Sequence, residues 1–248
     1  RSWGWASGPS QGRARRTARR TARRAAPLSS MSGSKGLVLV TGVGGFVGSH
    51  VALTLLEKGY RVRGTVRSIG GPATAHLTEH PKLSKVELVT ADLMADEAWP
   101  AAVAGCDAIM HTASPFPFGK VEPDSLVKPA LGGTERVLNA AAAAGIKRVV
   151  LTSSVVSVSS GRAKNDTAER VFTEEDWSNS ELCDEYPKSK TLAEKKAWEL
   201  AEKHSLQLTT INPSYVLGPI LSERDCTSLL MVQKLLSGAI PATPRIWI

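Results

Sequence analysis

Short apolar segments rich in β-branched residues alternate with longer segments of helical composition from residue 35 onward, and this alternation constrains the fold most. Six segments have the composition of strands: 36–40, 61–66, 86–90, 108–111, 148–152 and 208–212. Continuous apolar stretches such as LVLV in the first of them suit strands that are buried on both faces. Between the strands, segments 47–58, 126–144 and 189–204 have helical length and composition. The order predicts an α/β fold with a doubly wound parallel sheet of the Rossmann type.

A glycine-rich turn, TGVGGFVG, follows the first predicted strand. In it Gly42 permits a tight turn, Gly45 lets backbone N–H groups approach a pyrophosphate, and Gly48 lets the following helix pack closely. The N-terminus of that helix would face the anion, and Phe46 and Val47 beside it are expected to contact the cofactor. The strand before and the helix after distinguish this motif from an ordinary loop with spare glycines. The turn therefore predicts dinucleotide binding.

Arg67 stands about twenty residues past the glycines, at the end of the second predicted strand, where NAD-binding proteins usually present Asp or Glu to the ribose 2′-hydroxyl. A planar guanidinium beside Ser68 suits a 2′-phosphate instead, through paired charge-assisted hydrogen bonds. We therefore expect NADPH as the cofactor. The alternative for Arg67 is an ordinary surface arginine, and Arg63 is either a second phosphate contact or a solvated charge.

Further cofactor contacts are expected in the loops after the third and fourth strands. The Asp92 carboxylate can accept from the adenine amino group and Leu93 can cover the ring, although an Asp in a turn is often only a cap. The loop after the fourth strand consists of small residues and leaves room for the cofactor riboses. The residues of this loop that we expect to line the site are Thr112, Ala113 and Ser114. His111, just before them, is expected to be structural.

Tyr186 and Lys190 are four residues apart, as one turn of a helix requires, and follow a serine pair, Ser153 and Ser154, that ends the fifth predicted strand. A serine at that edge can donate to a substrate carbonyl. Because a phenol has an intrinsic pKa of about 10, we expect the Lys190 ammonium to favour its phenolate, so that Tyr186 can transfer a proton. A YxxxK pattern alone is typical of solvated helix faces, but its position after the serines favours catalysis.

The formal charge of +8 is concentrated at the N-terminus. Residues 1–30 hold eight of the 31 Lys and Arg and no acid, which leaves 23 basic against 23 acidic residues in the remainder. The neutral remainder argues against nucleic-acid binding. We expect residues 1–34 to be a disordered basic tail, which is either a transit-like segment or sequence that precedes an initiator at Met31.

No stretch approaches roughly eighteen consecutive apolar residues and nothing resembles a secretory signal, which predicts no membrane span. We expect a cytoplasmic location, or a plastid or mitochondrion if the tail is a transit peptide. The three cysteines lack CxxC spacing, which favours a reducing compartment and no bound metal. The alanine-rich segment 139–144 and Trp198 are expected in the core or, alternatively, in a subunit contact, so a homodimer stays open.

The chain resembles the extended short-chain dehydrogenase/reductases, and within them the dihydroflavonol reductase, cinnamoyl-CoA reductase and aldehyde reductase group. The matching segments run from residue 37 onward and are TGVGGFVG, VRGTVRS, HTASP, LTSSVVSV, YPKSKTLAEKKAW and INPSYVLGP. The resemblance implies that Ser154, Tyr186 and Lys190 form a catalytic triad. It also implies that Pro213 and Val216 lie against the nicotinamide.

The same resemblance implies an NADPH-dependent reductase of small-molecule aldehydes or ketones. Ser159 stands near where dihydroflavonol reductases carry an Asn, so we expect a broad carbonyl substrate range. The alternatives are an NAD-dependent nucleotide-sugar epimerase or dehydratase and a catalytically silent NADP-binding module. We expect an NADP-binding domain over residues 35–217 and, over 218–248, the start of an incomplete substrate lobe, because members of the group continue for roughly a hundred residues more.

Overall fold

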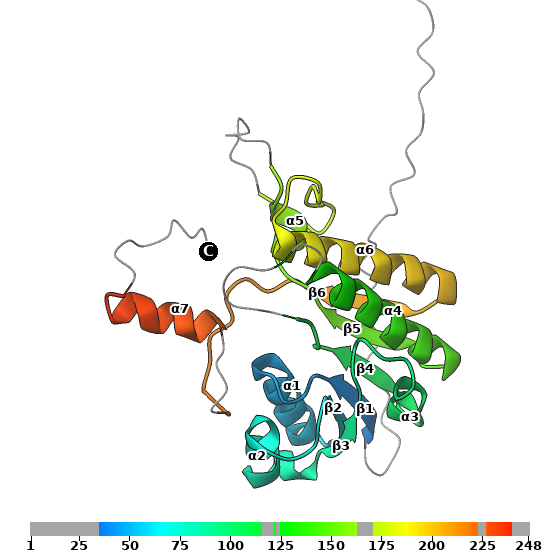
Figure 1. Ribbon diagram of the computed structural model, residues 1–248. Helices are drawn as coiled ribbons and strands as arrows, with labels where there is room; N and C mark the ends of the chain where they lie inside the picture. The colour runs from blue at the N-terminus through cyan, green and yellow to red at the C-terminus, as the bar shows by residue number, and fades with distance from the viewer. Residues whose placement is uncertain (1–34, 116–121, 123–124, 163–170, 223–226, 240–248) are drawn as a thin grey trace, which may run out of the picture.

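The computed structural model describes residues 35–115, 122, 125–162, 171–222 and 227–239. Its centre is a six-stranded parallel sheet with the order β3-β2-β1-β4-β5-β6 (Figure 1). The strands are β1 Lys35–Thr41, β2 Tyr60–Val66, β3 Glu87–Thr90, β4 Ala108–His111, β5 Arg148–Thr152 and β6 Gln207–Ile211. The predicted Rossmann fold is confirmed, and the predicted strand ends agree with these bounds to within about one residue.

The three long helices expected from the sequence are present, together with shorter ones that were not predicted. The helices are α1 Phe46–Glu57, α2 Pro72–Glu79, α3 Trp99–Val103, α4 Val127–Ala143, α5 Val156–Ser159, α6 Glu185–His204 and α7 Thr227–Leu236, with a 3₁₀ turn η1 Leu83–Lys85. Helix α6 begins before the predicted residue 189, because Pro187 is tolerated in a first turn, where its missing N–H has no intrahelical partner. Tyr186 therefore lies in the first turn of α6.

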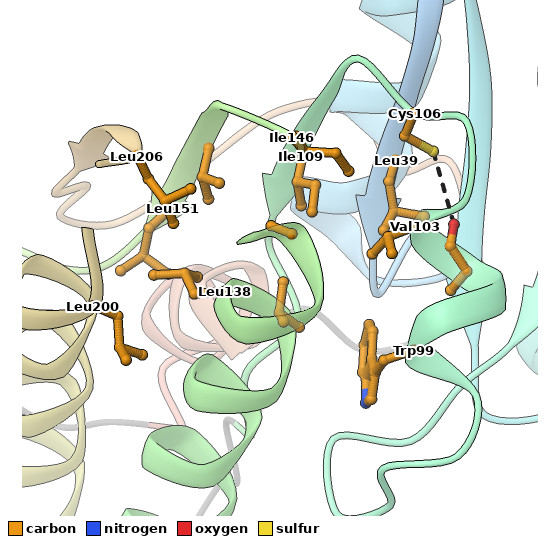
Figure 2. Packing of buried hydrophobic residues seen from close by; sticks show 14 of the residues in the cluster. Leu39, Trp99, Val103, Cys106, Ile109, Leu138, Ile146, Leu151, Leu200 and Leu206 are labelled. Carbon is orange, nitrogen blue, oxygen red and sulfur yellow. Dashed lines mark hydrogen bonds between the residues drawn. The ribbon is translucent and has the colours of Figure 1, made fainter. Parts of the chain in front are cut away.

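Helices cover the sheet on two faces, and each face has its own hydrophobic core (Figure 1). Side chains alternate along β1, so that Leu37 and Leu39 enter one core while Val38 and Val40 enter the other. Helices α3, α4 and α6 cover the Leu39 face, and α1, α2 and η1 cover the Val38 face. In Figure 2, Leu39, Ile109 and Leu151 of the strands lie near Trp99, Leu138 and Leu200 of the helices. Full burial of such side chains contributes about 1.5–3 kcal/mol each.

The alanine-rich segment 139–144 forms the end of α4, where Ala141 is fully buried in the Leu39-side core. This is the core position that the sequence favoured. The predicted tail, residues 1–34, lies outside the described residues, as does the end of the predicted lobe at 240–248. None of the helices in the described ranges combines the length and apolarity needed to cross a membrane.

Arg63 is anchored inside the structure, which corrects both interpretations offered above. Its side chain is 13% exposed and its Nε lies 2.9 Å from Glu87 Oε1. Its Nη1 donates to the carbonyl oxygens of Ala102 and Ala104, at 3.0 and 2.7 Å. These carbonyls lie at the C-terminal end of the short helix α3, where the guanidinium replaces the N–H donors that the helix itself no longer supplies. Arg63 therefore joins β2 to α3 and does not face the cofactor edge.

The strand order reverses between β1 and β4. Strands β2 and β3 are added on one side of β1, whereas β4, β5 and β6 are added on the other. Thr41 pairs with His111 in the register of these two strands, so both strands end side by side. Ligands of doubly wound folds bind at such a switch point, outside the carboxyl ends of the strands. The glycine turn after β1 and the loop after β4 consequently lie together.

Candidate active site

The glycine turn is shaped by close backbone contacts that leave no room for side chains. Gly42 has φ +65°, and a Cβ there would lie 2.9 Å from the Cα of Ala113 in the loop after β4. A Cβ on Gly48 would collide with the carbonyl oxygen of Gly42. The turn therefore packs α1 directly against the ends of β1 and β4, as the motif predicts.

The N-terminus of α1 offers unpaired backbone donors at this edge. Gly45 is the exposed N-cap residue and supplies no side chain to the helix. The first intrahelical bond runs from Ser49 N to Gly45 O at 2.9 Å, so the N–H groups of Phe46, Val47 and Gly48 precede it. The first turn also contains no acidic residue that would repel an anion. These residues fit the pyrophosphate of a dinucleotide.

Arg67 is exposed just beyond β2 and makes no hydrogen bond or ion pair with another described residue. Its guanidinium is therefore available to a ligand at the carboxyl edge. Asp92 is also exposed, but its Oδ1 accepts the backbone N–H of Met94 at 2.8 Å and so caps its own turn. Leu93 packs against Gly133 of α4, where a Cβ would lie 2.8 Å from Leu93 Cδ2. Both positions stay predictions as adenine contacts.

The loop after β4 is held by Thr41, which the sequence analysis did not select. The backbone N–H groups of Thr112 and Ala113 donate to Thr41 Oγ1 at 3.1 and 3.0 Å. Because this oxygen accepts twice, its own proton donates to Nδ1 of His111, 2.7 Å away. Ser114 follows in the same loop and is half-buried.

His111 is therefore a neutral acceptor at Nδ1 and not an acid–base group of the site. Its ring is 2% exposed, and burial lowers its pKa from 6.5 to about 3, with a smaller contribution in the same direction from the charge of Lys190. Its structural role agrees with the expectation from the sequence.

Ser154, Tyr186 and Lys190, the three candidate catalytic residues, converge at the carboxyl end of β5, and we call them the catalytic cluster. Ser154 is 6% exposed and hydrogen-bonds Tyr186, while Lys190 Nζ lies 5.9 Å from the centroid of the Tyr186 ring. Lys190 is 7% exposed, and burial lowers its pKa from 10.5 to about 8. At neutral pH it is consequently mostly protonated.

The expected lowering of the Tyr186 pKa by Lys190 is wrong for this structure. Burial raises the pKa of Tyr186 above its ordinary value of 10, and the hydrogen bond with Ser154 opposes this only in part. The desolvation of the phenolate is the larger of these two effects. The group that favours the phenolate in this structure is the Ser154 hydroxyl.

Pro213 lies beside the catalytic cluster, whereas Val216 is further along the chain. The Pro213 carbonyl accepts the backbone N–H of Val155 at 3.0 Å and lies 3.5 Å from Ser154 Oγ. Val216 is half-buried in the segment that then crosses toward α1, where the Pro219 carbonyl lies 2.9 Å from His50 Nε2. Segment 213–219 therefore joins the catalytic cluster to the start of α1.

Sequence reasoning missed Glu194, the fully buried carboxylate of α6. It accepts hydrogen bonds from four side chains, which are Ser153, Ser157, Asn212 and Trp198. We call these five residues the Glu194 network. Spacing could have identified it, because Glu194 follows Tyr186 and Lys190 at the same four-residue interval, with Ala193 and Ala197 beside it.

Two cavities among the described residues lie away from this edge. One of about 690 Å³ lies at the opposite end of the sheet beside Tyr60 and Lys82, and one of about 440 Å³ lies between Trp99 and Arg136. Neither contains convergent reactive groups, so the chemistry of the carboxyl edge decides the assignment. Among the described residues, no group of three or more His, Cys, Asp or Glu could hold a metal ion.

The fold and the site together define a doubly wound dinucleotide-binding protein with a Ser-Tyr-Lys constellation. The model of the NAD dependent epimerase/dehydratase family matches residues 38–244, and the chain belongs to this family. Cinnamoyl-CoA reductase 1 of Petunia hybrida is 40% identical over 217 residues, which cover 86% of this chain and 63% of that protein.

Solved structures of reductases share the fold. Vestitone reductase from alfalfa matches with a TM-score of 0.68 and 32% identity, over 81% of this chain and 64% of that one. The yeast methylglyoxal/isovaleraldehyde reductase complexed with NADPH matches with a TM-score of 0.70 and 30% identity, over 86% of this chain and 68% of that one. The predicted resemblance to the reductase group is confirmed. The chain spans less than two thirds of the length of the cinnamoyl-CoA reductases of petunia and Arabidopsis thaliana that it matches.

Proposed function

We propose that this chain carries the cofactor site and the catalytic cluster of an NADPH-dependent carbonyl reductase that converts an aldehyde or ketone into an alcohol. The observation that carries the proposal is the hydrogen bond between Ser154 and Tyr186, with the buried Lys190 Nζ 5.9 Å from the Tyr186 ring centroid, at the edge where α1 presents free N–H groups. The relatives support the same chemistry, since they are named reductases and the yeast protein is complexed with NADPH.

The residues of the catalytic cluster have distinct roles in this proposal. The Ser154 hydroxyl donates to the substrate carbonyl oxygen and holds it beside the Tyr186 phenol. NADPH, when bound, supplies a hydride to the carbonyl carbon, and the Tyr186 hydroxyl gives its proton to the oxygen, which completes the alcohol. Lys190 stabilises the phenolate that Tyr186 becomes, and solvent returns the proton. Segment 213–216 would lie against the nicotinamide, as the resemblance implies for Pro213 and Val216.

The cofactor would be held mainly by backbone groups. The N–H groups that begin α1 would bind the pyrophosphate, and Arg67 would bind the 2′-phosphate that distinguishes NADPH from NADH. The remaining residues proposed to contact the cofactor are Gly42, Gly45, Asp92, Leu93, Thr112, Ala113 and Ser114.

The first experiment compares the affinities of the purified chain for NADPH and NADH, measured by energy transfer from tryptophan to the nicotinamide. We expect NADPH to bind more tightly, and Arg67→Ala to weaken NADPH by about 10- to 100-fold, because charge-assisted hydrogen bonds contribute about 1.5–3 kcal/mol. Arg61→Ala is the matched control, since Arg61 is an exposed residue near the other end of β2. Equal or tighter NADH binding would overturn the NADPH assignment and favour the epimerase or dehydratase alternative.

The second experiment tests turnover. NADPH oxidation is followed with a panel of aldehydes, ketones and acyl-CoA thioesters that includes methylglyoxal, isovaleraldehyde and a cinnamoyl-CoA. Turnover that disappears in Tyr186→Phe supports the reductase. Tight NADPH binding without turnover on any carbonyl of the panel would instead favour the silent NADP-binding module.

A further inference from the structure

Glu194 is a carboxylate with 0% exposure, placed two helical turns beyond Tyr186 on α6. Its Oε2 accepts from Ser153 Oγ and Ser157 Oγ, both at 2.6 Å, and its Oε1 accepts from Trp198 Nε1 at 3.3 Å. Asn212 Nδ2 also donates to Oε2, at 2.8 Å. Several hydrogen bonds of this kind compensate a buried carboxylate for the loss of water. Glu194 thus gathers groups from the end of β5, from α5 and from the residue after β6.

The number of protons on each donor determines what the serines can do. A hydroxyl has one proton, and that of Ser153 is directed to Glu194. Ser153 is therefore not free to donate to a substrate, which leaves Ser154 as the donor of the pair. The single proton of Ser157 has two acceptors, Glu194 at 2.6 Å and the Ser154 carbonyl at 2.9 Å, and the shorter contact is to the carboxylate.

Asn212 links Glu194 to the backbone of Ser154 by hydrogen bonds. Its amide nitrogen lies 2.8 Å from Glu194 Oε2 and 3.1 Å from the Ser154 carbonyl oxygen. Ser157 Oγ is a third acceptor within reach, at 2.8 Å, so the two amide protons are shared among three neighbouring oxygens. Glu194 therefore holds both sides of Ser154. The preceding side chain, Ser153, bonds to Glu194 directly, and the Ser154 carbonyl is linked to Glu194 through Asn212.

Glu194 and Tyr186 belong to the same face of the same helix. Tyr186, Lys190 and Glu194 follow one another at four-residue intervals, so their side chains lie on one side of α6. The helix that carries the phenol consequently also carries the group that anchors Ser154. A rigid element with two such attachments sets the separation between the Ser154 hydroxyl and the Tyr186 hydroxyl.

We propose that Glu194 is a positioning residue for carbonyl reduction, which holds Ser153, Ser157 and Asn212 so that Ser154 Oγ faces the Tyr186 hydroxyl. This inference rests on the proposed reductase function. Glu194 acts through Ser154 and does not itself touch the reacting atoms. Its loss therefore disturbs the alignment that the transition state needs more than the binding of substrate.

The main test compares Glu194→Met, Glu194→Gln and Glu202→Gln in the full chain, by steady-state reduction of the best carbonyl of the panel. The methionine keeps the side-chain volume but removes every hydrogen-bond acceptor. We expect kcat to fall about 10- to 100-fold, with KM changed by less than about threefold, because a small misplacement of reacting groups lowers the rate of the chemical step. The glutamine oxygen can still accept from both serines and Asn212, so Glu194→Gln should restore most of kcat. Glu202 is exposed near the end of α6 and serves as the control without effect.

A double-mutant cycle separates positioning from a general loss of structure. In a Ser154→Ala background, Glu194→Met should have little further effect on kcat, because the group that it positions is already absent. An equal fold-loss of kcat in both backgrounds would overturn the proposal. If Glu194→Met does not fold, Asn212→Leu replaces it in the cycle, since it cuts the link between Glu194 and the Ser154 carbonyl.

A third measurement needs neither cofactor nor substrate and so distinguishes failure of this inference from failure of the reductase proposal. The phenolate of Tyr186 is titrated by ultraviolet absorbance and assigned by difference from Tyr186→Phe. The Ser154 hydrogen bond lowers the Tyr186 pKa. Its loss in Glu194→Met should therefore raise that pKa further, and Glu194→Gln should raise it less. A Tyr186 titration that is unchanged in a folded Glu194→Met protein overturns the inference, whether or not the chain reduces any carbonyl.

Discussion

The glycine turn and the catalytic cluster lie at the same edge of the sheet but are positioned by opposite means. The turn is defined by missing side chains, since Gly42 lies against Ala113 and Gly48 against the Gly42 carbonyl. The catalytic cluster is defined by buried polar side chains, with Lys190 at 7% and Ser154 at 6% exposure and Glu194 fully buried behind them.

The two regions should therefore respond to different perturbations. A backbone site tolerates changes of pH because it contains no titratable group, but it does not tolerate an added methyl group. A buried polar cluster tolerates a substitution that keeps the side-chain volume, but its stability and reactivity depend on which of its groups are charged. The predictions below test this contrast by changing one property at a time.

The largest expected effect is that of Tyr186→Phe, which removes one oxygen from the catalytic cluster. Turnover should fall about 10²- to 10⁴-fold, the range for a lost general acid. The NADPH affinity should stay within about twofold, because the cofactor is held mainly by the turn. Rapid kinetics and the tryptophan-to-nicotinamide signal measure the two quantities on the same protein. A parallel loss of affinity and turnover would show that the two regions are not separate.

The second prediction concerns the buried charge of Lys190. Its pKa of about 8 in the folded state lies below its ordinary 10.5, so below pH 8 the folded protein bears the full cost of a buried ammonium, about 3 kcal/mol. Between pH 8 and 10 the unfolded chain retains a proton that the folded chain loses, and stability should rise with pH. Above pH 10 the raised pKa of Tyr186 acts in the opposite direction, since the unfolded phenol ionises first.

Urea unfolding of the wild-type chain and of Lys190→Met at pH 8 and pH 10 measures this effect. We expect the wild type to gain stability relative to the methionine variant over that interval. Lys203→Met, at an exposed position in the last turn of α6, controls for the loss of a lysine in general. An equal rise in the wild type and in Lys190→Met would refute the assignment to Lys190.

The third prediction adds a methyl group to the turn. The new Cβ of Gly48→Ala would collide with the Gly42 carbonyl, so we expect a loss of about 1–3 kcal/mol of stability and weaker NADPH binding. Gly132→Ala is the comparison within α4, where the added methyl would meet Arg136 Nη1, the end of a side chain that bonds the Leu93 carbonyl, and no backbone atom. That variant should lose less than about 1 kcal/mol, because the gain in helix propensity offsets the disturbed hydrogen bond. Similar behaviour of the two variants would contradict a turn built on close backbone contact.

The contrast also explains how much could be predicted from the sequence. The fold and the glycine turn can be predicted because their signals are local in the sequence. A run of β-branched residues forms a buried strand, and at position 42 only glycine fits a φ of +65° against the neighbouring backbone. The Tyr186–Lys190 spacing is equally local. These features need no knowledge of distant residues.

The remainder depends on contacts between segments far apart in the chain. Nothing near Glu194 shows that Ser153, 41 residues away, donates to it, and nothing near Thr41 shows that it holds the loop 71 residues downstream. The wrong expectation for the Tyr186 pKa has the same origin, because the spacing indicates a nearby cation but not the burial that raises this pKa. Arg63 was misjudged because its partners lie on α3.

The smallest expected effect tests Asp92, for which the sequence offered a cofactor contact and a cap. In the structure its Oδ1 accepts the N–H of Met94, a bond that an asparagine oxygen can also accept. Asp92→Asn should therefore change stability by less than about 0.5 kcal/mol and NADPH affinity by less than about twofold, whereas Asp92→Ala should cost about 1 kcal/mol. Thermal unfolding and NADPH titration of the three proteins decide between the two roles. A clear loss of affinity in Asp92→Asn at unchanged stability would mean that the carboxylate charge itself meets the cofactor, and side-chain charge would then contribute to a region that we ascribe mainly to backbone shape.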